Sequence, residues 1–176
     1  MKTRTTLFFA IALGLFAVSA CKKKTTETPK PTGVVLCKVN GTAWESGSAM
    51  KAINIDGNYY YMTGATLQGD TLTIGAIRKD TDTSGIYFNA IPLKAGAVGT
   101  VNGTTNAYSG ALYMTRWDYV NGFVTALGKY NITYELSISK KDATNKTISG
   151  TFLINMTSGS GNIKVSEGEF IDLKYK

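Results

Sequence analysis

A strict alternation of apolar and polar residues in the C-terminal part of the chain sharply limits its possible folds. From residue 131 to residue 139, the apolar side chains Ile132, Tyr134, Leu136 and Ile138 fall on one parity and polar side chains on the other. Residues 148–157 repeat this pattern. Because successive side chains of a β-strand point to opposite faces, the period of two predicts two half-buried strands, joined by a hairpin loop over the polar stretch 140–147.

Further short apolar runs follow one another from residue 32 onward, and helical periodicity is hard to find among them. Asn-Gly or Asp-Gly pairs at 40–41, 56–57, 102–103 and 121–122 tolerate the positive φ of tight hairpin turns. The additional strands that we expect are 34–39, 49–55, 59–66, 71–78, 86–90, 108–115, 123–127 and 163–175. About ten short strands without a crossover helix predict an all-β fold, an antiparallel β-sandwich or a partly open barrel.

The last of these strands contains an irregularity. Phe170 falls on the polar parity of its strand, and Gly168 precedes it by two residues. One extra residue in the strand would return the aromatic ring to the apolar face, so we expect a β-bulge here.

The N-terminus has the features of a bacterial secretion signal. Lys2 and Arg4 precede an apolar run over 7–17, and the small residues 18–20 stand immediately before Cys21. The run is too short for an ordinary transmembrane helix. Val-Ser-Ala-Cys resembles the lipobox of bacterial lipoproteins, which implies cleavage before Cys21 and attachment of acyl chains to its thiol. The alternative is a plain secretory signal in which Cys21 is coincidental.

The chain therefore divides into a lipoprotein signal peptide (1–20), a lipidated N-terminus with a flexible tether (21–31) and a single all-β domain (32–176). Residues 22–31 read KKKTTETPKP and hold no large apolar side chain, so they cannot bury enough surface to offset the entropy of ordering. Lys22, Lys23 and Lys24 would stand next to the membrane, where basic residues are attracted to anionic lipid.

The net charge of +7 invites a nucleic-acid partner, but the distribution of the charge argues against one. The signal peptide carries two of the basic residues, and the tether carries four basic residues against Glu27. The domain from residue 32 onward holds 13 basic and 11 acidic residues, and the basic ones are scattered along the sequence. We therefore expect no nucleic-acid partner.

Several kinds of catalysis are disfavoured by the residue types present. The chain has no histidine, which excludes imidazole bases, imidazole zinc ligands and every Ser-His or Cys-His nucleophile. Cys37 lies in an apolar run and is expected to be a buried thiol. We expect no enzyme activity, no metal and no cofactor. A carboxylate-dependent hydrolase stays open only if two acidic residues converge in a cleft, the candidates being Asp56, Asp70, Asp80, Asp82, Asp118, Glu135, Glu167 and Glu169.

Aromatic residues supply the candidate ligand-binding site. Aromatic side chains pack well in strands, but they also stack on sugar rings. The candidates for such a surface are Trp44, Tyr59, Tyr61, Trp117 and Tyr119. Separately, 80–85 has the spacing of the first half of a calcium loop, but the residue at the twelfth position is Ile91 where a glutamate is required, which favours a plain acidic turn.

Three segments carry a family resemblance. CKVNGTAW at 37–44, KTISGTF at 146–152 and VSEGEF at 165–170 resemble a family of uncharacterised Bacteroidetes outer-membrane lipoproteins. The resemblance implies an all-β domain, anchored to the outer membrane of a Gram-negative envelope, and implies no activity. The basic residues after Cys21 leave open whether the domain faces the periplasm or the cell surface.

These observations lead to one functional hypothesis and one alternative. The hypothesis is a lipid-anchored envelope protein that acts as a non-catalytic ligand-binding module, with a glycan as the candidate ligand. The alternative is a structural or accessory subunit of an envelope complex. The expected partners are the membrane, through lipidated Cys21, and a glycan or another envelope protein.

Overall fold

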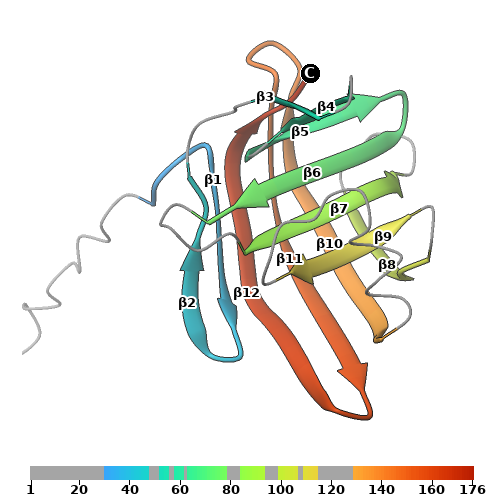
Figure 1. Cartoon of the computed structure of the whole chain (residues 1–176). Helices are drawn as coiled ribbons and strands as arrows, with labels where there is room; N and C mark the ends of the chain where they lie inside the picture. The colour runs from blue at the N-terminus through green and yellow to red at the C-terminus, as the bar shows by residue number, and fades with distance from the viewer. Residues whose placement is uncertain are drawn as a thin grey trace, which may run out of the picture.

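The fold consists of two antiparallel sheets and a short two-stranded ribbon (Figure 1). The computed structural model describes residues 30–47, 52–55, 58–61, 63–78, 84–93, 99–106, 109–114 and 129–176, with 52–55 and 58–61 described as backbone only. These residues contain twelve strands and no helix. The larger sheet has the order β2 (Thr42–Glu45), β1 (Val34–Val39), β12 (Gly161–Lys174), β11 (Thr147–Ser158), β10 (Asn131–Asp142) and β8 (Gly99–Thr104).

The second sheet packs across the first. Its order is β5 (Thr63–Gln68), β6 (Thr71–Ile77), β7 (Gly85–Pro92) and β9 (Gly110–Met114), and the separate ribbon pairs β3 (Ala52–Ile55) with β4 (Asn58–Tyr61). All strand neighbours are antiparallel. The all-β sandwich expected from the sequence is confirmed, and its two main sheets contain ten strands.

The alternation in the C-terminal part builds the centre of the larger sheet. Along β10 the apolar residues of the alternation are buried, whereas Asn131, Thr133 and Glu135 are exposed. β10 and β11 both extend further than the sequence indicated, to Asp142 and from Thr147, so the predicted eight-residue loop shrinks to the turn 143–146. One face of this sheet therefore packs in the core, and the other, which we call the wet face, is exposed to solvent.

Aromatic rings join the two sheets in the core. Phe88 of β7 packs edge-on against Phe152 of β11, with ring centroids 5.2 Å apart, and against Tyr134 of β10 at 6.3 Å. Phe170 of β12 continues this cluster, with its ring stacked on Phe152 at 6.4 Å. Because such aromatic pairs add to the gain from buried area, this cluster contributes strongly to holding the sheets together.

The expected bulge in the last strand is confirmed. Between the pairs Phe152–Gly168 and Ile154–Val165, β12 uses three steps where β11 uses two, and Glu167 has a φ of 51°. The extra residue reverses the parity of the rest of the strand, so Phe170 reaches the core with 1% of its surface exposed.

Three expectations about strands and turns are wrong. Residues 59–66 do not form one strand, because the segment divides between β4 of the ribbon and β5 of the smaller sheet. The strands β2 and β8 were not expected, and the Asn102-Gly103 pair lies inside β8, where the sequence suggested a turn. Gly103 is needed there because a Cβ atom would lie 2.5 Å from the Tyr134 hydroxyl on the neighbouring strand.

Two further sequence predictions are confirmed, and others lie outside the described residues. Asn40 and Gly41 form the expected tight turn, with φ values of 48° and 82°. Cys37 is buried as expected. The predicted strand 123–127 and the turns at 56–57 and 121–122 lie outside the described residues.

Candidate functional site

An open groove on the wet face of the larger sheet is the candidate site. Its cavity volume is about 360 Å³, and it crosses β10, β11 and β12 near their middle. The residues that line it are Lys30, Glu135, Thr151, Phe152, Leu153, Glu167, Gly168 and Glu169. Three of these eight residues are glutamates, so carboxylates dominate the polar part of the groove.

Two of the glutamates lie in one groove because they stand two residues apart on β12, on either side of the buried Gly168, and so share the face that points to solvent. At the bulge, Glu167 also takes a left-handed backbone conformation. Gly168 between them touches Phe152 closely, since a Cβ atom there would lie 2.5 Å from the Phe152 carbonyl oxygen. The register then places Glu169 opposite Thr151, which provides a hydroxyl on the neighbouring strand.

Lysines pair with two of the three glutamates. The Lys30 ammonium lies 2.5 Å from Glu169 Oε2, and the Lys38 ammonium lies 2.8 Å from Glu167 Oε2. These side chains are solvent-accessible, so each pair contributes little to stability. Glu135 has no hydrogen-bond or ion-pair partner among the described residues. The groove therefore offers one carboxylate that is ready to accept hydrogen bonds from a ligand.

Apolar surface lies next to these polar groups. Leu153 is half-buried on β11, directly opposite Glu135 on β10, and the Phe152 backbone forms part of the floor. A patch of this kind, with a few carboxylate and hydroxyl groups around apolar surface, suits a ligand that has hydroxyl groups on a ring with apolar faces. The groove is open to solvent, so it does not exclude water in the manner of an enclosed catalytic site.

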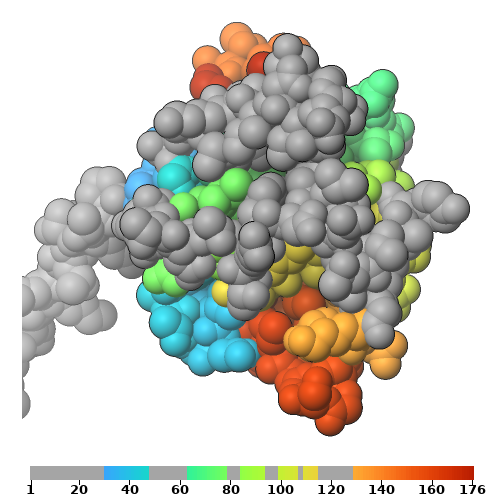
Figure 2. Space-filling model, viewed as in Figure 1, coloured from blue at the N-terminus to red at the C-terminus, as the bar shows by residue number. Residues whose placement is uncertain are grey.

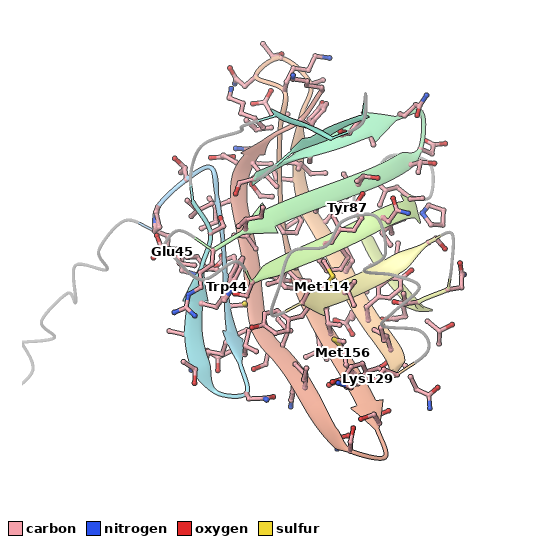
Figure 3. All side chains as sticks on the ribbon, in the orientation of Figure 1. Trp44, Glu45, Tyr87, Met114, Lys129 and Met156 are labelled. Atoms are coloured by element: carbon pink, nitrogen blue, oxygen red, sulfur yellow. The ribbon has the colours of Figure 1, made fainter. Side chains whose placement is uncertain are left out.

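Trp44 is placed differently from what the ligand-surface hypothesis requires. Its side chain is 3% exposed and belongs to the core, at the corner where β2 approaches the smaller sheet (Figure 3). The indole Nε1–H donates a hydrogen bond of 2.9 Å to Ser84 Oγ. A buried ring cannot stack on a ligand that approaches from solvent, so Trp44 is a packing residue.

The remaining predicted site residues lie outside the described side chains. Tyr59 and Tyr61 belong to β4, of which only the backbone is described. Trp117, Tyr119 and Cys21, the predicted site of lipid attachment, lie outside the described residues altogether. Among the described residues, therefore, none of the predicted aromatic side chains lines the groove.

Among the acidic candidates for a hydrolase site, by contrast, three side chains line the groove. Glu135, Glu167 and Glu169 converge in the groove, whereas Asp70 lies in the β5–β6 turn of the other sheet. The other four, Asp56, Asp80, Asp82 and Asp118, lie outside the described residues. The sequence already contained one signal for this site, because Glu135 lies at a solvent-facing position of the alternation in β10. That residues of β10 and β12 line the same groove could be seen only from the order of the strands in the sheet.

Metal and thiol chemistry find little support in the described part of the chain. No group of three His, Cys, Asp or Glu residues suited to a metal ion occurs among the described residues. Ile91, at the twelfth position of the calcium-like spacing, is fully buried in β7, while 80–83 lie outside the described ranges. Burial raises the pKa of the Cys37 thiol to about 12, so this thiol stays protonated and unreactive at neutral pH.

Comparison with known proteins adds no relative. No family model matches the chain, and neither the curated proteins nor the solved structures contain a match. Among the described residues there is also no helix long and apolar enough to cross a membrane. The fold and the groove thus define the class of this protein only as an antiparallel β-sandwich with an acidic groove on one sheet face.

Proposed function

We propose that this protein is a lipid-anchored component of the bacterial outer membrane, attached through Cys21, and that it acts as a non-catalytic ligand-binding module. The single observation that carries the proposal is the open groove with its unpartnered Glu135 carboxylate, a description that holds for the part of the chain that the structure describes. The proposed site is this groove; of the aromatic candidates, Trp44 is buried, and the side chains of the other four lie outside the described part of the structure.

The chemistry of the groove favours a glycan as the ligand. Carboxylates accept hydrogen bonds from pairs of sugar hydroxyls, Thr151 can donate or accept one more, and Leu153 offers apolar surface to a sugar ring. Binding is favoured over hydrolysis because the groove is open to water and lysines neutralise Glu167 and Glu169. A carboxylate pair for hydrolysis would require one protonated and one ionised group in a sheltered site.

Binding to bacterial envelope polysaccharides tests the proposal. The full chain is screened by affinity electrophoresis, and hits are measured by isothermal titration calorimetry for the wild type and for Glu135→Gln. Loss of a charge-assisted hydrogen bond should weaken binding by roughly tenfold or more. The matched control is Asp70→Asn, an exposed carboxylate on the other sheet, and it should bind like the wild type. Equal affinity of Glu135→Gln and wild type would exclude the groove as the site.

A second candidate function rests on the edge strand β8. This strand reads GTVNGT, is largely exposed, and pairs only with β10 among the described residues. Edge strands usually carry charges or proline that prevent pairing with another chain, and β8 has neither. An accessory subunit that receives a partner's strand at this edge would fit the observation.

In-cell crosslinking followed by purification tests this alternative. An accessory subunit should co-purify with an envelope protein, and Asn102→Lys, which places a charge on the edge, should abolish the association while Asp70→Asn preserves it. Purification of the crosslinked chain alone would remove the alternative.

A further inference from the structure

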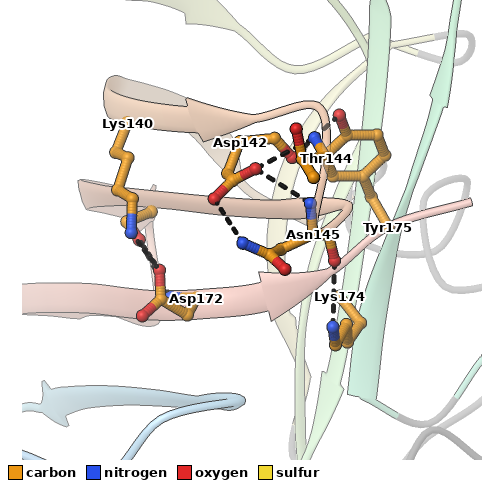
Figure 4. Close-up of polar contacts among 8 residues, drawn as sticks. Lys140, Asp142, Thr144, Asn145, Asp172, Lys174 and Tyr175 are labelled. Carbon is orange, nitrogen blue, oxygen red and sulfur yellow. Dashed lines mark hydrogen bonds and ion pairs between the residues drawn. The ribbon is translucent and has the colours of Figure 1, made fainter.

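A cluster of lysines marks one end of the larger sheet. Lys140 and Lys141 directly precede Asp142, the last residue of β10; Lys146 lies in the turn that connects β10 to β11, and Lys174 ends β12. The register brings them together, because Lys141 pairs with Ile148, and Thr147 pairs with Lys174. All four side chains are exposed. We call these four residues and the turn 143–146 the basic end; Figure 4 shows two of its lysines, Lys140 and Lys174, with their partners.

The acidic groups within this cluster are already engaged. The Lys140 ammonium lies 2.9 Å from Asp172 Oδ1. Figure 4 marks this ion pair with a dashed line. The Asp142 carboxylate accepts hydrogen bonds from the backbone N–H groups of Thr144 and Asn145 and from the Asn145 side chain. Four lysines against two aspartates leave the basic end with a formal charge of +2.

The other lysines of the basic end keep their charge available. Lys174 donates to the Asn145 carbonyl oxygen at 2.9 Å, and Lys146 stands 5.8 Å from the centre of the Tyr175 ring. Both contacts position the ammonium groups without neutralising them. Lys141 has no partner among the described residues.

The N-terminal segment enters β1 nearer to the basic end than to the opposite end of the sheet, and Lys30, three residues before Gly33, reaches Glu169 in the groove. The Gly33 N–H donates to the Ile171 carbonyl oxygen at 2.7 Å, and Val34 pairs with Ile171, three residues before Lys174. The opposite end of the sheet holds the β1–β2 and β11–β12 turns, where the Asn40 N–H donates to the Lys164 carbonyl oxygen. Figure 2 shows the β10–β11 turn and the β11–β12 turn at opposite ends of the molecule.

We propose that the basic end lies against the anionic phospholipid surface of the membrane that holds the chain. The proposal rests on the lipid anchor at Cys21 from the proposed function. From Cys21 to Gly33 the chain reaches at most about 40 Å, so an anchor at Cys21 keeps the start of β1 within that distance of the membrane. By sequence, Lys22, Lys23 and Lys24 add positive charge next to the anchor, where anionic lipid attracts basic residues. The groove, halfway along the sheet face, stays open to the aqueous side.

A fluorescent label at each end of the sheet tests the orientation. The full lipid-anchored chain is reconstituted in phosphatidylcholine vesicles with or without phosphatidylglycerol. An environment-sensitive dye is attached to a cysteine introduced at the basic end, Ala143→Cys, or at the opposite end, Gly159→Cys, where added side-chain atoms meet open space. Buried Cys37 does not compete for the dye.

The expected result is a fluorescence increase for Ala143→Cys on phosphatidylglycerol vesicles only, with no change for Gly159→Cys. At low salt, removal of each lysine should weaken the surface contact by about fivefold. The triple variant Lys141→Gln, Lys146→Gln, Lys174→Gln should therefore lose the increase, whereas Lys129→Gln with Lys164→Gln at the opposite end should keep it. Concentrated salt should abolish it, since the screening length falls to about 3 Å at 1 M.

Two negative outcomes have different meanings. If the chain floats with vesicles but both labels respond alike, or the triple variant keeps the response, the orientation is refuted while the anchor stands. If the chain floats with neither kind of vesicle, the anchor at Cys21 is refuted, and the orientation that depends on it falls as well. Calorimetry with polysaccharides is unaffected by either outcome, so the ligand-binding proposal is judged separately.

Discussion

Gly168→Ala is the substitution that most sharply probes the bulge beneath the groove. No unusual φ forbids alanine at this position, but its Cβ would lie 2.5 Å from the Phe152 carbonyl oxygen and 2.6 Å from two atoms of the Phe152 ring. The ring belongs to the aromatic cluster between the sheets, and the oxygen belongs to the β11 backbone. Neither is the flexible end of a surface side chain, so β11 and β12 would have to move apart.

The size of the effect can be worked out from this geometry. Overpacking by one carbon costs about 1–3 kcal/mol, and a backbone oxygen as the obstacle places Gly168→Ala near the upper value, at about 3 kcal/mol. For a domain of this size, that corresponds to a decrease in Tm of about 6–12 °C. Gly159→Ala is the matched control, because nothing lies within 4 Å of its added Cβ, and its stability should stay within about 0.5 kcal/mol of the wild type.

Urea unfolding followed by circular dichroism, together with a thermal scan, measures both variants. Gly168→Ala should unfold at clearly lower urea concentration than Gly159→Ala, with an unchanged slope. A Gly168→Ala variant as stable as the wild type would mean that β11 and β12 are not packed as described, and the geometry of the groove would have to be abandoned.

Three other predictions concern single residues. Cys37 should resist alkylation by iodoacetamide in native buffer at pH 8 and react only in urea, because burial raises its pKa to about 12; rapid native labelling would contradict its burial. Trp44→Phe should cost about 2 kcal/mol in urea unfolding through a lost buried hydrogen bond and a partly filled space, and a neutral result would place the indole outside the core. Hydrogen bonds from the Asn145 backbone and side chain lower the pKa of Asp142. The ionised carboxylate therefore stabilises the folded protein above the unfolded-state pKa, and this stabilisation is lost as the pH falls through the folded-state value. Asp142→Asn should flatten the decrease in urea midpoint below about pH 4, and a pH profile identical to that of the wild type would argue against these bonds.

Local pattern was sufficient for the fold class. The alternation in β10 and β11 reflects a sheet with one buried face, and this periodicity survives in any single sequence. The bulge at Gly168 was accessible for the same reason, since Phe170 violated the parity of its strand. The short edge strands β2 and β8 were missed because their few residues carry no strong periodicity.

The Asn102-Gly103 pair shows where local rules fail. Its composition favours a tight turn, yet the glycine is required because the Tyr134 side chain on the neighbouring strand leaves no room for a Cβ atom. That requirement arises from a pairing between segments about thirty residues apart, which turn propensity does not contain. The segment 59–66 failed similarly, because an apolar run does not reveal a change of sheet within it.

The candidate site depended even more on long-range contacts. Glu135 and Glu169 are far apart in the sequence and meet only because β10, β11 and β12 are neighbours in the sheet. Trp44, by contrast, was selected for its residue type, and its burial depends on how β2 approaches the smaller sheet. Residue type suggested a ligand surface, whereas topology decided which side chains remain accessible.

An NMR titration of the full chain with envelope polysaccharide fragments, read out on the backbone amides, would locate the ligand-binding site without prior choice of a residue. We expect chemical-shift changes centred on Glu135, Thr151 and Gly168, and their loss in Glu135→Gln. Shifts confined to the 52–61 ribbon or to residues 115–128 would assign binding to the aromatic residues instead. That result, or the absence of shifts with every fragment, would contradict the groove as the ligand-binding site.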